Sequence, residues 1–202
     1  MKKRQALLTL LLLAALSMVQ ANALQPDELI KQTSEKVLKI LQDNKAEYEK
    51  NPEKVSHLVD TIIIPLVDFR AMSKLALGKN WRSANEDQQL RFTEAFKIML
   101  IRTYSKSLIE YTDQKIEFLP YDGPEEGKRT TEVKTQVMQA SGPAIPIDYR
   151  LREKDGEWKV YDIKIDGISL VTNYRNSFAA DIRKVGMDGL IDKLLNKADA
   201  SS

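Results

Sequence analysis

The chain has 202 residues, with 31 basic and 29 acidic side chains, one histidine and no cysteine. Thiol catalysis and cysteine-rich zinc sites are therefore excluded, and a single histidine cannot form a two-histidine metal site. The near balance of charges lacks the basic excess typical of nucleic-acid-binding domains, so we expect no nucleic-acid partner. A chain of this length fits one domain that folds without disulfide crosslinks.

The first 23 residues have the three zones of a secretory signal. Cations at positions 2–4 precede an apolar run at 6–16, and Ala21-Asn22-Ala23 supplies the small residues that signal peptidase requires. The apolar run is shorter than the roughly 18 residues that a retained membrane anchor needs. We predict export and cleavage after Ala23, leaving residues 24–202 as one domain. Cleavage removes three basic residues and no acidic residue, so the net charge is +2 for the whole chain and about −1 for the mature chain.

Helical spacing of apolar residues follows the signal. Pro26, with two acidic residues after it, predicts the start of a helix that continues to about residue 44. Asn51-Pro52 predicts a second helix, which Pro65 interrupts. Asp68 is expected to cap a third, short helix that ends at Gly78.

A longer helix is predicted next, and after it the pattern changes. Ser83, with Glu86 three residues later, predicts a capping box for a helix that reaches about residue 111. From Lys115 the apolar residues alternate, and turn-forming sequences divide four predicted strands at about 115–121, 129–139, 145–153 and 157–165. After Gly167 helical spacing returns, with a last amphipathic segment around 190–195.

This order of elements predicts an α+β fold. Short connections favour an antiparallel meander, and strict alternation gives each strand a single apolar face. We expect a curved sheet of four or more strands, covered on one face by several helices. An apolar cavity is predicted between the sheet and the helices.

Two segments carry a recognisable pattern. The first, at 65–81, reads PLVDFRAMSKLALGKNW and is followed by FTEAF in the long helix; the second, at 158–178, reads WKVYDIKIDGISLVTNYRNSF. In this order and after a signal sequence, they resemble the MlaC family, also called the toluene-tolerance auxiliary-component family. The similarity extends across most of the mature chain.

The resemblance implies a monomeric periplasmic protein that holds a phospholipid by its acyl tails. Such a protein exchanges lipid between an outer-membrane lipoprotein–porin complex and an inner-membrane transporter with MCE-type and ABC-type subunits, and so maintains outer-membrane lipid asymmetry. The phospholipid is cargo, and no cofactor is implied.

The resemblance also places lipid-binding residues in the matching segments. These are Leu75, Leu77, Leu170, Val171, Tyr174 and Phe178. Apolar patterning adds residues expected to face the space between sheet and helices: Met99, Tyr104, Val133, Val137, Ile147, Tyr149 and Ile163. No catalytic or metal-ligating residue is predicted.

Elementary energetics agree with a carrier. At about 0.8 kcal/mol per methylene, two acyl tails with about 30 methylenes represent on the order of 20 kcal/mol of exposure to water. The chain has no G-x-x-x-x-G-K-[ST] phosphate loop with which to use ATP. We therefore expect passive carriage, with direction set by the relative affinities of the partner complexes.

Two other classes of function stay open. An enzyme of the cone-shaped α+β superfamily, such as a small isomerase or dehydratase, needs an acid–base pair inside its pocket, for example an aspartate beside His57. Asp162 and Asp166 alternate with Ile163 and Ile165, so we expect both carboxylates to point to solvent. The third possibility is a periplasmic chaperone or adaptor without a small ligand.

Overall fold

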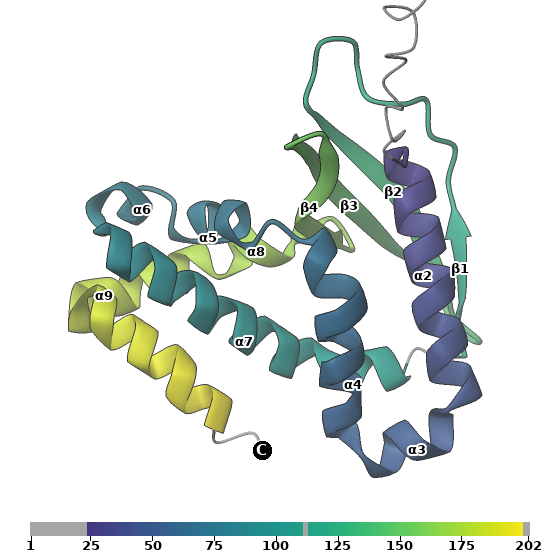
Figure 1. Ribbon diagram of the computed structural model, residues 1–202, viewed down its shortest axis with the longest axis horizontal. Coiled ribbons are helices and arrows are strands. Elements are labelled where there is room, and N and C mark those ends of the chain that lie inside the picture. Colours follow the sequence, from purple (N-terminus) through teal and green to yellow (C-terminus); the bar gives the residue numbers. More distant parts are fainter. Residues whose placement is uncertain (1–23, 111–112, 200–202) are drawn as a thin grey trace, which may run out of the picture.

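Residues 24–110 and 113–199 are described by a computed structural model, in which an open sheet stands beside a group of helices (Figure 1). The predicted signal sequence lies outside the described residues. No helix in the described part of the chain is both long and apolar enough to cross a membrane.

The sheet has five antiparallel strands in sequence order. They are β1 (Lys115–Phe118), β2 (Thr130–Met138), β3 (Ile145–Lys154), β4 (Glu157–Ile165) and β5 (Ile168–Ser169). Asp155-Gly156 and Asp166-Gly167 connect the last three strands, and all four residues have positive φ, as a two-residue type I′ turn requires. The predicted meander is thus confirmed; β1 ends earlier than expected, and β5 was not predicted.

One face of the sheet, called here the inner face, is covered by the first helix, α2 (Pro26–Asp43). Ile30 of α2 packs with three buried residues from β2, β3 and β4: Val133, Leu151 and Val160. Pro26 occupies the first turn of α2, as its fixed φ favours. The predicted first helix is therefore confirmed; Ile30 in its first half packs on the sheet, whereas Val37 and Leu41 in its second half pack in a separate cluster with Leu58.

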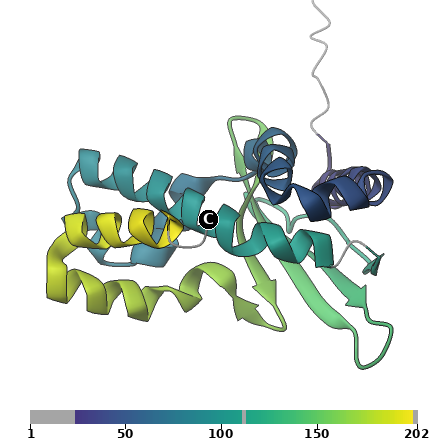
Figure 2. The ribbon, with the colours of Figure 1, turned by 90° about the horizontal axis from the view of Figure 1, so that it is seen from below.

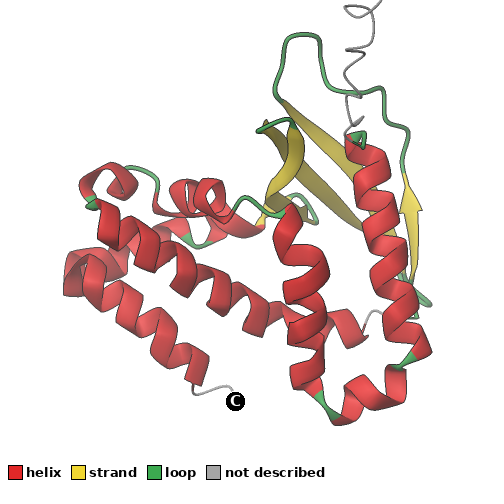
Figure 3. Cartoon of the chain, in the orientation of Figure 1, coloured by secondary structure: helices red, strands yellow, loops and turns green. Residues whose placement is uncertain are grey.

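The chain then turns beside α2 through short helices (Figure 3). These are α3 (Lys45–Lys50), which was not predicted, α4 (Pro52–Leu58), the π-helix η1 (Val59–Ile63) and the 3₁₀ helix η2 (Ile64–Leu66). Regular α-helix ends at Leu58, and Pro65 lies in the 3₁₀ helix with which this helical stretch ends. Immediately afterwards the Asp68 N–H donates to the Val160 carbonyl at 2.8 Å, which ties this segment to β4.

The remaining helices form a second layer beside the sheet (Figure 2). They are α5 (Phe69–Leu77), α6 (Asn80–Ser83), α7 (Glu86–Glu110), α8 (Leu170–Asn173) and α9 (Arg175–Asp199). Phe92, Phe96 and Phe178 lie at the centre of their core, with ring centroids 5.6 Å apart for each pair. Non-helical angles at Gly186 (φ 75, ψ 179) divide α9, and residues on both sides of this break pack into the same core.

One predicted helix cap is confirmed and another is wrong. The Asp68 side chain accepts a hydrogen bond from the Ala71 N–H at 3.0 Å, as expected for the cap of α5. Ser83, in contrast, is the last residue of α6. The capping box of α7 lies two residues later: Asn85 Oδ1 accepts from the Gln88 N–H at 2.8 Å, and Gln88 Oε1 accepts from the Asn85 N–H at 3.3 Å. The same spacing of side-chain types occurs twice in this stretch, so spacing alone did not decide between them.

Candidate functional site

The predicted lipid-binding residues occupy two parts of the molecule. Those in the core of the helical layer, or packed against it, are Leu75, Leu77, Met99, Tyr104, Leu170, Val171, Tyr174 and Phe178. Val133, Tyr149 and Ile163 belong to the cluster between the sheet and α2. Val137 and Ile147 share the inner face with them, through alternation and strand register. The structure therefore does not gather all of the predicted residues into one group.

Several of these residues are already enclosed by protein. Leu77, Val133, Val171 and Phe178 are each at most 3% exposed, and Val137 is 6% exposed. A bound molecule contacts surface that the protein leaves uncovered, so in this conformation these five side chains pack the interior. These side chains can pack around a binding site, but they provide no exposed surface for a ligand to contact.

A row of apolar side chains on the inner face is covered less completely. Strand register places Tyr149 beside Ile163 and Ile147 beside Ile165. Ile147, Tyr149 and Ile163 are half-buried, and Ile165 is 38% exposed. Ile165 was not among the predicted site residues, although its alternation with Asp166 indicated the same face. The β3–β4 part of the inner face thus presents apolar surface that α2 does not seal.

A bulge changes which residues of β4 face inward. The register shifts between Arg150 and Leu151, so Leu151 pairs with Val160, and Val160 is 5% exposed. Strict alternation along β4 would place Tyr161 on the same face as Ile163. Instead the Tyr161 ring lies beneath the Arg150 guanidinium, whose central carbon is 5.1 Å from the ring centroid. An extra residue in one strand reverses the alternation on one side of it.

Tyr149 joins the inner face to α2. Burial raises the pKa of the Tyr149 phenol, while side-chain hydrogen bonds with Ser34 of α2 and Thr135 of β2 act in the opposite direction. Thr135 is itself buried and donates to the Ile147 carbonyl at 2.9 Å. The phenol is therefore neutral at ordinary pH and has polar partners at its hydroxyl end, while its ring belongs to the apolar row.

A second pair of phenols connects α7 with the start of α9. The hydroxyl oxygens of Tyr104 and Tyr174 are 3.3 Å apart, and the Tyr174 ring stacks on Phe178 with centroids 5.3 Å apart. Burial, followed by the hydrogen bond to Tyr174, raises the pKa of Tyr104. Both side chains remain half-buried. They offer flat apolar surface and hydroxyl groups.

The prediction that Asp162 points to solvent is wrong. Its side chain is 0% exposed, and its carboxylate accepts from Ser169 Oγ at 2.9 Å and from the Val171 N–H at 3.3 Å, and lies 3.3 Å from Arg150 Nη1. Alternation assigned Asp162 correctly to the face opposite Ile163. After the Asp166-Gly167 turn, however, β5 pairs with the edge of β4, and α8, which follows it, packs against β4 and encloses the Asp162 carboxylate.

The acid–base pair that the enzyme alternative requires is not formed by these groups. His57 is exposed on α4. The buried Asp68 and Asp162 carboxylates both accept backbone N–H groups and lie near arginines, with 3.6 Å between Arg152 Nε and Asp68 Oδ2. Within the described residues, no three histidine or acidic side chains are grouped as metal binding would need. The site offers apolar surface and neutral phenols.

Comparison with known proteins identifies relatives along nearly the whole chain. The family model described as MlaC protein matches residues 31–196. The toluene tolerance protein ttg2D of Pseudomonas putida is 32% identical over 188 residues, covering 93% of this chain and 86% of that protein. The intermembrane phospholipid transport system binding protein MlaC of Haemophilus influenzae is 26% identical over 202 residues, covering 98% of this chain and 94% of that protein.

A solved structure has the same fold. The phospholipid-binding protein from Ralstonia solanacearum, determined in complex with a phospholipid, superposes with a TM-score of 0.79 at 30% sequence identity. The match covers 88% of this chain and 99% of that one. The likeness therefore extends over the sheet and the helical layer together.

Proposed function

Because the chain belongs to the MlaC family, we propose that it binds phospholipid acyl chains at the inner face of its sheet and carries the lipid between membranes. The observation that carries this proposal is the apolar row at the β3–β4 part of the inner face, where Ile147, Tyr149 and Ile163 are half-buried beside the more exposed Ile165. The relative solved with a phospholipid supports this choice of ligand.

The chemistry of this surface suits a carrier. Aliphatic and aromatic side chains make contacts without strong directional preference, so an acyl chain can enter and leave without breaking fixed polar bonds. The half-buried phenols of Tyr104 and Tyr174 extend the apolar surface available from the helical layer. We propose that the cavity between sheet and helices forms, or widens, around the acyl chains.

The proposal includes an exported monomer that acts in the periplasm. Its cargo would be exchanged with the inner-membrane transporter containing MCE-type and ABC-type subunits, and with the outer-membrane lipoprotein–porin complex. Transfer would be passive and without a cofactor, since a carrier only has to offer an affinity between those of its donor and acceptor. The protein would perform no chemistry on the lipid.

Lipid analysis of the native protein tests the proposal directly. The mature chain is purified without detergent and extracted with organic solvent, and the extract is analysed by mass spectrometry. We expect phospholipid in stoichiometric amount. Protein that is folded but free of phospholipid, even after incubation with phospholipid vesicles, would overturn the proposed function and favour the chaperone or adaptor.

Substitutions test the proposed location. Ile147→Glu places a carboxylate beside the acyl chains, which costs about 2 kcal/mol or more without a polar partner and weakens lipid binding by about thirtyfold. Ile147→Trp fills the same space without adding charge and is expected to reduce bound lipid as well. The matched controls are Leu90→Glu and Leu90→Trp, because Leu90 is 59% exposed on α7. Full lipid content in a folded Ile147→Glu variant would show that the acyl chains bind elsewhere.

A further inference from the structure

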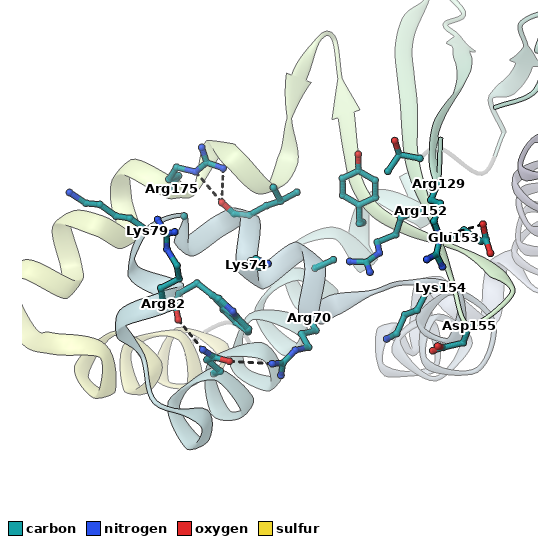
Figure 4. A pocket seen from close by; sticks show the side chains of 17 residues that line it. Arg70, Lys74, Lys79, Arg82, Arg129, Arg152, Glu153, Lys154, Asp155 and Arg175 are labelled. Atoms are coloured by element: carbon teal, nitrogen blue, oxygen red, sulfur yellow. Dashed lines mark hydrogen bonds and ion pairs between the residues drawn. The ribbon is translucent and has the colours of Figure 1, made fainter. Parts of the chain in front are cut away.

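A basic hollow of about 1090 Å³ lies between α5, α6 and the strand ends of the sheet (Figure 4). Eight of the described residues that line it are lysine or arginine, whereas two are acidic. The whole chain is nearly neutral, with 31 basic and 29 acidic residues. Positive charge is therefore concentrated at this place, although mutual repulsion opposes such clustering.

The helical side of the hollow carries cations without acidic partners. Lys74, Lys79 and Arg82 are exposed and project from α5, α6 and the turn between them. Within the described part of the chain, none of these three has a carboxylate within ion-pair distance. Their charge is available to a partner.

Two arginines on the same side are held by neutral groups. Arg175 donates from Nε and Nη2 to the Leu75 carbonyl at 3.0 and 2.7 Å. The Arg70 guanidinium lies over the Trp81 ring, 5.3 Å from its centroid, and donates to Gln89 Oε1 at 3.3 Å. Both guanidinium groups are thus positioned while their charge stays uncompensated, which lowers the entropy cost of binding an anionic group.

The strand side adds cations that are only partly neutralised. Arg152 Nε and Lys154 Nζ share the single carboxylate of Asp68, at 3.6 and 3.8 Å. Arg129 lies 3.6 Å from Glu153. Because Arg152 follows Leu151, whose side chain faces α2, Arg152 lies on the opposite, outer face of the sheet. Arg152 therefore lines the hollow from the face of the sheet opposite the apolar row.

We propose that this basic hollow is a docking site for an acidic segment of a partner protein. Charge complementarity argues for the segment, since cations line the hollow from two sides and three of them have no acidic partner. Its volume exceeds what one phosphate group fills, and its concave shape fits a protruding chain better than a flat bilayer. On its strand side, Arg152 lies on the outer face of the sheet, whereas the apolar row lies on the inner face.

Binding of a fluorescent oligo-glutamate peptide to the full mature protein, followed by anisotropy, tests the proposal. The triple variant Lys74→Glu, Lys79→Glu and Arg82→Glu is expected to bind the peptide at least about tenfold more weakly, because three exposed charges each contribute modestly. Binding to the wild type is expected to weaken as salt rises from about 0.1 M to about 1 M, which shortens the screening length from about 10 Å to about 3 Å.

The matched control reverses three exposed cations outside the hollow: Lys31→Glu, Lys36→Glu and Arg183→Glu. It changes the net charge equally and is expected to keep wild-type peptide affinity. Equal loss in both triple variants would overturn the proposal, as would binding to phosphatidylglycerol vesicles or inorganic phosphate without binding to the peptide. Lipid content is measured in parallel and is expected to be unchanged in both variants, so failure of the docking site is distinguishable from failure of the carrier.

Discussion

At the scale of single residues, Asp162 has a structural role that the presence of an aspartate in this strand did not predict. A carboxylate in a strand next to a glycine turn is consistent with a solvated side chain or with an acid–base group. Here its oxygens accept from Ser169 and from the Val171 N–H, and Arg150 lies beside it. The carboxylate therefore fixes the segment that begins α8 against β4, and with it the start of the chain that leads to Tyr174 and Phe178 in the helical core.

Replacing this carboxylate should weaken the fold. Asp162→Ala leaves the buried Val171 N–H without an acceptor and Arg150 without its partner, so we expect the free energy of unfolding to fall by about 1–3 kcal/mol. Asp162→Asn keeps an acceptor oxygen and should cost less. Urea denaturation measures both, with Asp192→Ala, at an exposed helical position, as the control. An unchanged midpoint for Asp162→Ala would contradict the structural role.

At the scale of elements, the chain changes direction within α9 at the break beside Gly186 (Figure 2). Two glycines are required there for different reasons. Gly186 has φ 75 and ψ 179, a backbone conformation that only glycine adopts readily. Space is not the constraint, because a Cβ at Gly186 would meet no atom within 4 Å. Gly189 has no such backbone requirement, but a Cβ there would lie 2.6 Å from Val185 Cβ. Val185 follows Phe178 and Ile182 at helical spacing, but it is 57% exposed beside the break at Gly186.

Substitutions should separate these two causes. Gly186→Ala is expected to destabilise the protein by about 1–3 kcal/mol through backbone strain. Gly189→Ala should also destabilise it, and Val185→Ala should restore stability to the Gly189→Ala variant but not to Gly186→Ala. Thermal unfolding of the single and double variants provides the measurement. Rescue of Gly186→Ala by Val185→Ala would show that crowding, and not the backbone angle, sets the requirement.

At the scale of the whole molecule, the sheet divides two surfaces of different chemistry. Its inner face carries the partly covered apolar row, and its outer face borders the basic hollow. A carrier with this arrangement can contact a partner through charge while its cargo stays on the other side of the sheet. Substitutions in the hollow and in the apolar row are therefore expected to act independently on docking and on lipid content.

Removal of bound lipid should destabilise the entire domain. A ligand that binds only the folded state adds about 2.7 kcal/mol of stability when its concentration is 100 times its dissociation constant. We expect the Tm to fall on delipidation and to recover when phospholipid is returned. Differential scanning calorimetry before extraction, after extraction and after re-addition makes this comparison. An identical Tm in all three samples would argue that no lipid occupies the folded protein at those concentrations.

Local chemistry made much of the fold predictable. Pro26 and Asp68 mark helix starts through their own backbone preferences, and the Asp-Gly pairs favour the turns on either side of β4. Ser83 was misassigned because Asn85 offers an equivalent cap two residues later, and α3 carries no buried residue that would have given it an apolar stripe. Such competing local choices are resolved by packing.

The candidate site was predictable to a smaller extent. Periodicity predicted that one face of the sheet carries Val133, Ile147, Tyr149 and Ile163. The structure places all four on the inner face. Periodicity does not show how much of a side chain another element covers. It therefore did not distinguish the enclosed Val133 from the half-buried Ile147. The basic hollow was not predicted, since its cations come from separate parts of the sequence.

The α+β order, the antiparallel meander and the resemblance to a lipid-binding family can be inferred from the amino-acid sequence, because these depend on short-range spacing and on motifs. The burial of Asp162, the incomplete covering of the apolar row and the convergence of scattered lysines and arginines on one hollow follow from tertiary packing. Coverage and convergence depend on contacts between distant segments such as α8 with β4 and α5 with the strand ends. Sequence periodicity describes each element alone and does not specify its neighbours.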